Sequence, residues 1–489
     1  QGQGLARRLL QMDRNRIPRP GVTPEQETSH ALDPPSRCGA IPPCLRQRCA
    51  RADARQAGPR SRIPSCLARQ RGLPVVAGHH AAGVADHLAR LESLNCGKPL
   101  HLARQDDLNA TVDVFRFFAG AVRCQTGQLS GEYLPGYTSM VRRDPIGVVA
   151  SIAPWNYPIM MAAWKIAPAL AVGNSVVLKP SEKSPLTALK LAELALEAGI
   201  PPGVFNVVPG FGPEAGSPLA LHMDVDCIAF TGSTRVGKQI HVMAGQSNLK
   251  RAWTELGGKS PNIVFADCPD IDKAVEAAVG SIFFNQGESC NAPSRLFVEA
   301  SIKDAFLEKA LKLVPNYQPA NPLDKNTVMG AIVDKLQLDN VMRYIDLGKS
   351  EGAQLLAGGE RALCDSGGCY VLPTIFDGVT PQMTIAREEI FGPVLAVQSF
   401  TDAADVVKQA NNSVYGLQAG VWTRDINKAH GVARALRAGT VHVNQYDEDD
   451  ITVPFGGFKQ SGVGRDKSLH AFDKYTEVKT TWIRIDSPV

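Results

Sequence analysis

Gly147-Val148-Val149-Ala150-Ser151-Ile152 is an apolar run rich in β-branched residues, and it predicts a buried strand. The chain after it alternates helices and strands. We expect helices over 159–172 and 186–198, and strands over 175–178, 205–208 and 227–230. Short strands separated by helices of about ten to fifteen residues are typical of βαβ units, which build a parallel sheet. This stretch therefore predicts an α/β domain of the nucleotide-binding type.

The same alternation resumes after residue 257 and predicts a second α/β domain. Strands are expected near 262–265, 295–298, 394–400 and 439–443. On the N-terminal side, an amphipathic helix is expected from about His87, with Leu88, Leu91 and Leu94 at helical spacing and a stop at residues 97–99. A second helix is expected over 108–122, and extended chain over 127–143.

The composition fits a folded, multi-domain chain. Its 489 residues suggest about three domains, and 44% hydrophobic with 20% charged residues exclude a mainly disordered or fibrous protein. The net charge of +4 averages two unlike parts: residues 1–80 hold 14 Arg, no Lys and 5 acids, whereas 81–489 hold 38 basic and 43 acidic residues. Because the larger part is mildly acidic, we expect no nucleic-acid partner.

The apolar runs and the cysteines indicate the environment of the chain. The uncharged run 145–164 is about as long as a membrane span, but Pro154 and Pro158 interrupt it, so we expect no membrane insertion. Eleven cysteines without a CxxC pair argue against a zinc ribbon, and we expect no metal site. We interpret the cysteines as reduced thiols of a cytoplasmic protein without a secretory signal.

Residues 1–85 differ from the rest of the chain. They contain no Phe, Tyr or Trp, and the first aromatic residue is Phe115, so they lack the usual anchors of a core. A transit peptide and a basic nucleic-acid-binding tail are two interpretations. We favour a third, translation of a GC-rich gene in a shifted frame, because Arg, Pro, Ala and Gly dominate and the first Lys is Lys98.

Three segments that follow predicted strands are candidates for cofactor binding. Residues 210–215, Gly-Phe-Gly-Pro-Glu-Ala, fit the GxGxxG/A pattern weakly, and a plain turn is the alternative. Residues 230–237, Phe-Thr-Gly-Ser-Thr-Arg-Val-Gly, lie where a strand passes into a helix, and free N–H groups there suit a pyrophosphate. Lys179 and Glu182 could grip ribose hydroxyls or form a solvated pair.

Cys290 is the candidate nucleophile. Most lone cysteines are small buried hydrophobes, so a nucleophilic role requires a stabilised thiolate and a nearby group for proton transfer. Glu255, which precedes the pair Gly257-Gly258, is the candidate group because two glycines let the backbone approach closely.

Seven motifs follow one another between residues 86 and 489. They are Pro154-Trp155-Asn156-Tyr157-Pro158, Lys-Pro-Ser-Glu at 179–182, the segment 230–237, Glu-Leu-Gly-Gly-Lys at 255–259, Asn-Gln-Gly-Glu-Ser-Cys at 285–290, Glu-Glu-Ile-Phe-Gly-Pro at 388–393 and Pro-Phe-Gly-Gly-Phe-Lys-Gln-Ser-Gly at 454–462. Together they resemble the signature set of the NAD(P)-dependent aldehyde dehydrogenases. The resemblance implies a Rossmann-type cofactor domain, an α/β catalytic domain and a small oligomerisation flap.

The resemblance also implies a chemistry. Cys290 would attack the aldehyde, Asn156 and the Cys290 N–H would stabilise the oxyanion, and Glu255 would be the general base that hydrolyses the thioester. We expect NAD, with NADP possible but less favoured, because the Glu182 carboxylate should accept the 2′ and 3′ hydroxyls and repel a 2′-phosphate. The implied cofactor-binding residues are Trp155, Lys179, Glu182, Gly232, Ser233, Gly237, Leu256, Glu389 and Phe391.

The substrate is expected to be a small-molecule aldehyde. By the resemblance, Tyr157, Trp164 and Phe455 line an apolar tunnel. Four consecutive acids beside it, at 447–450, are either a solvated turn or a collar that attracts a cationic aldehyde, with Asp447 and Asp449 as the substrate-facing members. Residues 461–471 resemble the bacterial enzymes of polyamine and arginine breakdown that act on γ-glutamylated aminobutyraldehyde and guanidinobutyraldehyde.

The expected organisation follows from these motifs. Residues 86–126 and 146–257 would form the NAD-binding domain, 258–457 the catalytic domain, and 127–145 with 473–487 the flap of a homodimer or homotetramer. Pro293 departs from the family pattern, in which glycine is usual. A catalytically silent relative, an acylating enzyme that uses coenzyme A, and a dehydrogenase of betaine or simple aliphatic aldehydes are the alternatives.

Overall fold

The computed structural model describes residues 81–125 and 130–486, so the expectations for residues 1–80, 127–129 and 487 lie outside the described residues. The apolar run 147–152 forms strand β3 (Val148–Ile152), which lies at the centre of a six-stranded sheet of order β17-β7-β6-β3-β4-β5. Neighbouring strands are parallel except for the edge strand β17. The other strands are β4 (Ser175–Lys179), β5 (Phe205–Val207), β6 (Cys227–Thr231), β7 (Arg251–Glu255) and β17 (Gly462–Val463).

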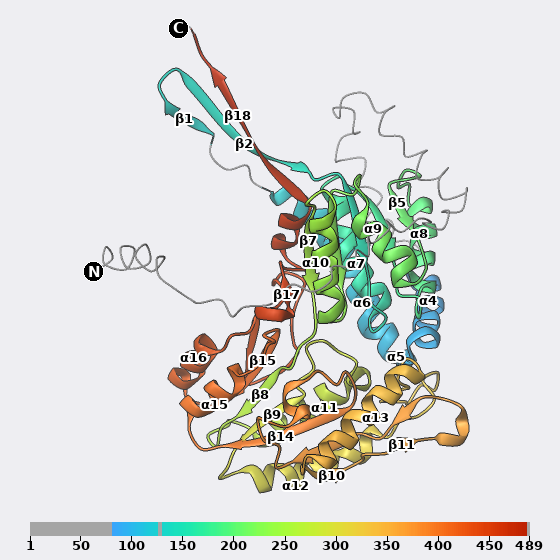
Figure 1. Cartoon of the computed structure of the whole chain (residues 1–489), viewed down its shortest axis with the longest axis vertical. Helices are drawn as coiled ribbons and strands as arrows, with labels where there is room; N and C mark the ends of the chain where they lie inside the picture. The colour runs from blue at the N-terminus through green and yellow to red at the C-terminus, as the bar shows by residue number, and fades with distance from the viewer. Residues whose placement is uncertain (1–80, 126–129, 487–489) are drawn as a thin grey trace, which may run out of the picture. The chain divides into compact units, whose positions relative to one another are not determined.

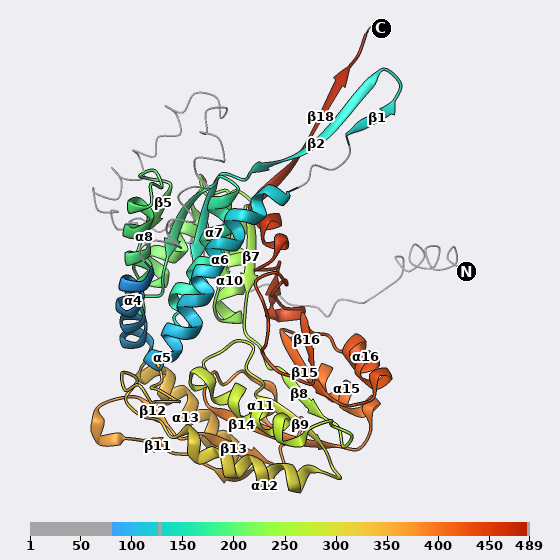
Figure 2. The same ribbon diagram turned by 180° about the vertical axis from the view of Figure 1, so that it is seen from behind.

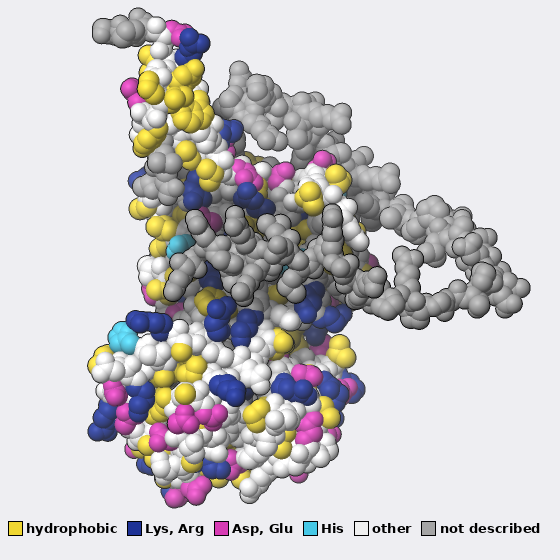
Figure 3. All heavy atoms as spheres, turned by 60° about the vertical axis from the view of Figure 1, so that its left-hand side comes forward, with side chains coloured by type: hydrophobic (Ala, Val, Ile, Leu, Met, Phe, Trp, Pro, Cys, Tyr) yellow, Lys and Arg dark blue, Asp and Glu magenta, His cyan; other side chains and the backbone are white. Residues whose placement is uncertain are grey.

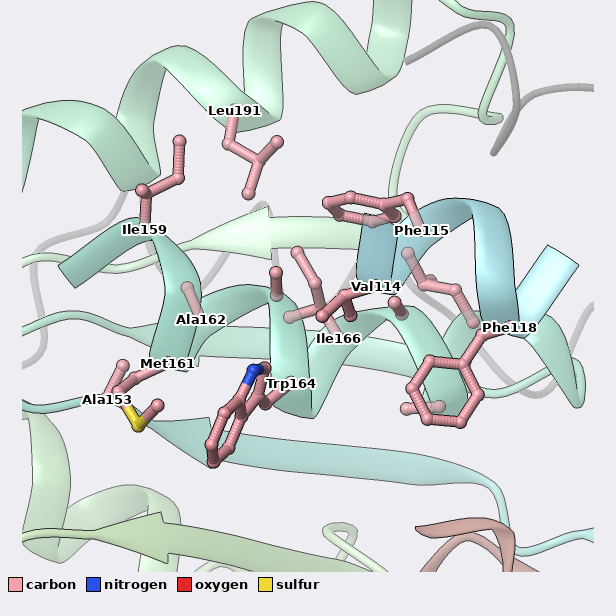
Figure 4. Close-up of a cluster of buried hydrophobic side chains, with 14 of the residues drawn as sticks. Val114, Phe115, Phe118, Ala153, Ile159, Met161, Ala162, Trp164, Ile166 and Leu191 are labelled. Carbon is pink, nitrogen blue, oxygen red and sulfur yellow. The ribbon is translucent and has the colours of Figure 1, made fainter. Parts of the chain in front are cut away.

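Helices cover both faces of this sheet (Figures 1 and 2). On one face α7 packs against β3 and β4 and is itself covered by α6 and α8; α10 packs on the other face against β6 and β7. Figure 4 shows Phe115 and Phe118 of α6 and Leu191 of α8 directed toward α7, which is buried along almost its whole length and is apolar on nearly every side. The helices of this part are α4 (Ala81–Cys96), α5 (Leu100–Leu102), α6 (Leu108–Ala121), α7 (Pro158–Ala171), α8 (Leu186–Glu197), α9 (Ser217–Leu221) and α10 (Thr234–Gln246).

A second sheet has seven strands in the order β10-β13-β14-β9-β8-β15-β16, all parallel to their neighbours except β10. Apolar cores lie between this sheet and its helices. Its strands are β8 (Pro261–Val264), β9 (Arg295–Glu299), β10 (Gln354–Ala357), β13 (Thr374–Asp377), β14 (Val394–Phe400), β15 (Gln418–Trp422) and β16 (Thr440–Val443), and β11 (Arg361–Ala362) pairs with β12 (Tyr370–Val371) as a separate ribbon. The helices are α11 (Ile271–Phe283), α12 (Lys303–Leu313), α13 (Lys335–Ser350), α14 (Thr384–Arg387), α15 (Ala403–Asn411) and α16 (Ile426–Ala435).

A three-stranded antiparallel flap consists of β1 (Gly131–Leu134), β2 (Tyr137–Pro145) and β18 (Thr476–Arg484), with β2 between the other two. Figure 3 shows hydrophobic side chains on its surface. They include exposed Tyr133, Val478 and Trp482. A sheet with so much exposed apolar surface indicates a contact surface.

The strands and helices that the sequence predicts are present among the described residues, and their ends differ from the prediction by no more than one residue. The extended chain expected over 127–143 corresponds to β1 and β2 and ends two residues later, at Pro145. The first helix is another exception, because it already begins at Ala81. Its predicted apolar face is also partly wrong: Leu94 is exposed and Glu92 is buried instead. Glu92 Oε1 accepts the N–H of Ile159 at 2.8 Å, so it satisfies a free donor in the first turn of α7.

The run 145–164, considered as a membrane span and rejected, comprises the end of β2, strand β3 and the first half of α7. Within residues 81–125 and 130–486, every helix is too short or too polar to cross a membrane.

Candidate active site

Cys290 lies on a tight turn between α11 and β9. The N–H of Ala292 donates to the carbonyl oxygen of Ser289 at 3.2 Å, which makes Cys290 and Asn291 the central residues of the turn. Behind the turn, a Cβ on Gly258 would lie 2.2 Å from the Cys290 carbonyl oxygen. The backbone at Gly258 therefore supports the back of the turn at a distance that only glycine permits.

Pro293 follows the turn without breaking it. The donor that closes the turn is the N–H of Ala292, and the N–H of Ser294 donates to the Ala292 carbonyl oxygen at 2.8 Å. Proline lacks an N–H, but no hydrogen bond of the turn needs one at this position.

Glu255 is the last residue of β7 and is buried. Within the described part of the chain, neither of its carboxylate oxygens has a conventional hydrogen-bond donor. Burial raises the pKa of Glu255 to about 8; Lys165 and the thiol of Cys290 oppose this rise, and Asp466 adds to it. The carboxyl is thus poised to exchange a proton near neutral pH.

The thiol of Cys290 is half-buried and neutral in this environment. Burial, followed by the negative charges of Glu255 and Glu389, raises the pKa of Cys290 well above its ordinary value. A thiol of this kind becomes a nucleophile only when a neighbouring base removes its proton. The carboxyl of Glu255 is in contact with this thiol.

Two N–H donors lie close to Cys290. Asn156 precedes α7, and its Nδ2 donates one hydrogen to the carbonyl oxygen of Glu288 at 3.0 Å. The main-chain carbonyl oxygen of Asn156 accepts a hydrogen bond from Asn285 Nδ2 at 3.1 Å, which fixes the backbone before α7. Among the described residues no acceptor binds the main-chain N–H of Cys290. The second hydrogen of the Asn156 amide and the Cys290 N–H can therefore both serve an oxyanion.

The strand ends of the six-stranded sheet place the predicted ribose-binding pair. Ile152 at the end of β3 pairs with Lys179 of β4 and with Phe230 of β6, so all three strands end at one edge. Lys179 Nζ lies 3.1 Å from Glu182 Oε2, and the Glu182 side chain is 36% exposed. The Lys179 side chain of this pair is buried, whereas the Glu182 carboxylate is exposed to solvent.

Helix α10 begins at the same edge. Ser233 Oγ accepts the N–H of Val236 at 3.4 Å and caps the helix. A Cβ on Gly232 would lie 2.7 Å from the Phe230 ring, and one on Gly237 would lie 2.5 Å from Leu256 Cδ2. Gly237 thus lets α10 pack closely on Leu256.

The competing glycine segment, 210–215, follows the edge strand β5 and enters a π-helical turn (Gly212–Gly216) that continues into the five-residue helix α9 (Ser217–Leu221). The first turn of α10 instead begins where the central strand β6 ends, and its free N–H groups suit a phosphate.

Glu389, Phe391 and Trp155 meet beside the glycine pair. The N–H of Gly258 donates to Glu389 Oε1 at 2.9 Å, and a Cβ on Gly257 would lie 2.1 Å from Glu389 Oε2. Burial raises the pKa of Glu389 to about 7. The rings of Trp155 and Phe391 pack edge to face with centroids 5.3 Å apart. Trp155 comes from the motif 154–158, and Glu389 and Phe391 come from the motif 388–393, so two distant motifs converge near Glu255.

The residues predicted to line the tunnel also come together. The rings of Trp164 and Phe455 lie 5.2 Å apart, edge to face. The hydroxyl of Tyr157 donates to Ser289 Oγ at 3.1 Å, beside the nucleophile. Lys98 Nζ lies 3.6 Å from the centroid of the Tyr157 ring.

The two predicted collar acids have different surroundings. Asp449 forms an ion pair of 2.7 Å with Lys467, whose Nζ lies 5.5 Å from the ring centroid of Trp164. Asp447 instead accepts hydrogen bonds from the neutral amides of Asn291 and Gln418. Of these two acids, Asp447 is the one that no Lys or Arg side chain contacts among the described residues.

Four residues of the site escaped the sequence analysis: Ser289, Asn291, Gln418 and Tyr446. The Tyr446 hydroxyl donates to the carbonyl oxygen of Asn291 at 2.7 Å, and Asn291 Nδ2 donates to Gln418 Oε1 at 3.3 Å. Ser289 and Asn291 adjoin Cys290 in sequence, which was the available signal. Gln418 and Tyr446 reach the site only through the pairing of β15 and β16.

The sequence of the chain is similar to those of known proteins. Residues 50–481 match the aldehyde dehydrogenase family, a match that begins inside the segment 1–85. PuuC of Escherichia coli, named an NADP/NAD-dependent aldehyde dehydrogenase, is 51% identical over 403 residues, which are 82% of this chain and 80% of PuuC.

Solved structures agree with the fold. AldA of P. syringae, an indole-3-acetaldehyde dehydrogenase solved as a mutant with NAD+ and IAA, is 52% identical with a TM-score of 0.87, covering 90% of this chain and 89% of AldA. A gamma-glutamyl-gamma-aminobutyraldehyde dehydrogenase from Burkholderia cenocepacia is 55% identical with a TM-score of 0.84, covering 86% of this chain and 85% of its own. The predicted fold class is thereby confirmed. The chain belongs to the aldehyde dehydrogenase family, whose members are NAD(P)-dependent oxidoreductases that act on aldehydes.

Proposed function

We propose that Cys290 is the nucleophile of this reaction, Glu255 its general base and Asn156 an oxyanion donor. One observation carries the assignment: a buried carboxyl whose oxygens have no conventional donor among the described residues faces the thiol. Because burial raises the pKa of Glu255 to about 8, its carboxylate is a stronger base than an ordinary glutamate and still ionises near neutral pH.

The residues divide the work as follows. Glu255 accepts the thiol proton, and the Cys290 sulfur bonds to the aldehyde carbon, while Asn156 and the Cys290 N–H donate to the resulting oxyanion. NAD, when bound, would supply the hydride acceptor, and loss of the hydride would leave an acyl thioester on Cys290. Glu255 must first release the thiol proton to solvent, and it then takes a proton from water while the water oxygen attacks the thioester carbon. The carbon–sulfur bond breaks, the carboxylic acid leaves, and the Cys290 sulfur takes the proton back from Glu255.

Two substitutions test these roles. Cys290→Ala should abolish NADH formation from propanal, whereas Cys124→Ala, at an exposed thiol, should not change it. Glu255→Gln should allow little turnover, and intact mass should show no acyl-enzyme, because the variant lacks the base that removes the Cys290 thiol proton. An active Cys290→Ala enzyme would contradict the assignment. Turnover of the wild type only with added coenzyme A would favour the acylating alternative, and no turnover at all would favour a silent relative.

The residues present also fit NAD as the cofactor, and we infer a preference for it over NADP. The exposed end of Glu182 is an acceptor suited to ribose hydroxyls, and Lys179 holds it in place. Gly232 and the first turn of α10 offer N–H groups to a pyrophosphate. A carboxylate at this position repels a 2′-phosphate, so Glu182→Gln should reduce the ratio of kcat/KM with NAD to that with NADP. An unchanged ratio would refute the role of Glu182.

For the substrate we infer an aldehyde with a distal cation, such as an ω-amino or guanidino aldehyde. The Burkholderia relative is named for an aminobutyraldehyde derivative, which supports the aminoaldehyde class, although its amine is acylated and so neutral. The structural support is Asp447, which lies beside the tunnel residues and bonds to Asn291 but has no cationic partner among the described residues. Asp449 is the weaker candidate because Lys467 already balances its charge.

Asp447→Asn and Asp449→Asn each remove a negative charge while leaving the size of the side chain almost unchanged, so they test the effect of charge on substrate binding. An amide at 447 can still accept from Asn291 but carries no charge. Asp447→Asn should raise KM for 4-aminobutanal at least about tenfold more than KM for propanal, which corresponds to about 1.4 kcal/mol of charge attraction. Asp449→Asn should raise it much less. Equal effects on both aldehydes would refute the inference and favour a simple aliphatic substrate.

We also infer a homodimer or homotetramer in the cytoplasm. The flap exposes Val478 and Trp482 on β18, and an apolar strand of this kind is stabilised by a second copy. The seven described cysteines are all unpaired, as in a reducing compartment. Trp482→Glu should lower the mass measured by light scattering to that of a smaller species; an unchanged mass would place the contact elsewhere.

A further inference from the structure

Polar side chains form a continuous hydrogen-bonded chain across the turn that carries the nucleophile. The Tyr157 hydroxyl donates to Ser289 Oγ at 3.1 Å, and Ser289 Oγ donates to Asn291 Oδ1 at 2.6 Å. Asn291 Nδ2 in turn donates to Asp447 Oδ1 and, at 3.3 Å, to Gln418 Oε1. Ser289 and Asn291 are the two residues that flank the nucleophile in the sequence, so the chain passes on both sides of it.

Every polar group of the Asn291 side chain has a partner. Both hydrogens of Nδ2 are donated and Oδ1 accepts, while the main-chain carbonyl oxygen accepts from the Tyr446 hydroxyl at 2.7 Å. Only 9% of the residue is exposed. A buried amide with all its hydrogen bonds made has a single favourable orientation, because any rotation would leave donors unpaired.

The partners come from distant parts of the chain. Tyr157 directly precedes α7, which packs on the six-stranded sheet. Gln418 begins β15 and Asp447 follows β16, both in the seven-stranded sheet. The turn is therefore held between elements of the two sheets rather than by its own loop alone.

We propose that Asn291 is a positioning residue that holds the Cys290 thiol against Glu255 by tying the turn to Asp447. The proposal rests on the assignment of Cys290 as the nucleophile and adds a residue that acts through it. Misplacing a reacting atom by about 1 Å costs roughly a hundredfold in rate, so a residue that fixes this turn contributes to kcat without touching the aldehyde.

The electrostatics of Asp447 agree with this role. Burial raises the pKa of Asp447 to about 7, and Asp449 adds to the rise, whereas the hydrogen bonds from Gln418 and Asn291 oppose it. The Asp447 carboxyl therefore ionises as the pH rises through about 7. Because an ionised acceptor makes the stronger hydrogen bond to the Asn291 amide, this hydrogen bond strengthens over the same pH range.

The test is a donor–acceptor exchange between positions 291 and 447. Asn291→Ala should lower kcat for propanal by about 10- to 100-fold and change KM by less than about threefold. Asn291→Asp removes the donor and sets two carboxylates against each other. Adding Asp447→Asn to Asn291→Asp restores a donor and an acceptor with exchanged roles, and should recover at least about tenfold of the lost kcat.

Controls separate positioning from folding. Asn206→Ala, at an exposed asparagine that donates to Gly203 O at 2.8 Å, should leave kcat unchanged. Each variant is compared by its thermal midpoint. Three outcomes would overturn the proposal. Asn291→Ala could keep the wild-type kcat, or its loss of kcat could equal the unfolded fraction. The double variant Asn291→Asp with Asp447→Asn could also have a kcat no higher than that of Asn291→Asp. Those outcomes leave the nucleophile assignment standing, which fails only if Cys290→Ala is active.

Discussion

Replacing Gly258 by alanine should displace the nucleophile without disturbing the fold. The φ angle of Gly258 lies outside the left-handed region, so alanine is allowed there by its backbone conformation. The obstacle is steric: the new Cβ would lie 2.2 Å from the Cys290 carbonyl oxygen, against 3.4–4 Å for an ordinary contact. The turn must therefore retreat by about 1 Å, and kcat should fall about a hundredfold, or about 2.7 kcal/mol in the barrier.

The assay is steady-state NADH formation with propanal, together with thermal unfolding. Gly245→Ala, at a helical glycine whose Cβ would meet nothing within 4 Å, is the neutral control. Gly257→Ala is the informative neighbour, because its Cβ would strike the carboxylate of Glu389, which can rotate away. It should raise KM for NAD more than it lowers kcat. If Gly258→Ala keeps kcat within about threefold of the wild type, the close support of the turn has no catalytic role.

Two further results follow from the buried charges. With propanal, kcat/KM should rise as the pH rises through about 8. Burial raises the pKa of the Glu255 carboxyl to about 8, and Glu255 can accept a proton only after this carboxyl has ionised. Glu255→Gln should remove this rise from the pH profile, and a rise that persists in the variant would belong to another group. Lys98→Met should lower the free energy of unfolding in urea by about 3–5 kcal/mol, because it leaves Asp107 buried without its ion-pair partner at 2.5 Å. Arg104→Met breaks an exposed ion pair with Asp86 and should lower it by under about 1 kcal/mol. Equal losses would show that the buried pair is not a significant source of stability.

The fold and the local motifs were predictable because their signals lie in short stretches of sequence. The run at 147–152 shows a strand by its own apolar residues, and the segment 230–237 shows a strand passing into a helix by the change of period. The hydrogen bond between Asn291 and Asp447 joins residues 156 positions apart, and no periodicity records it. Glu92 was missed for a related reason, since its partner is the N–H of Ile159 at the start of another helix.

The stretch 255–258 explains why so much of the site could nevertheless be inferred from sequence. Glu255 faces the thiol, Leu256 packs against α10 at Gly237, Gly257 abuts the Glu389 carboxylate and Gly258 abuts the Cys290 carbonyl. Two of these four residues thus contact Cys290, one at its thiol and one at its carbonyl oxygen, and the other two contact α10 and Glu389. Each position tolerates little change, because a residue from a distant part of the chain packs directly against it. A motif that brings several separate elements together in this way stays recognisable, whereas the Asn291 network spreads the same kind of constraint over residues that only the folded chain brings together.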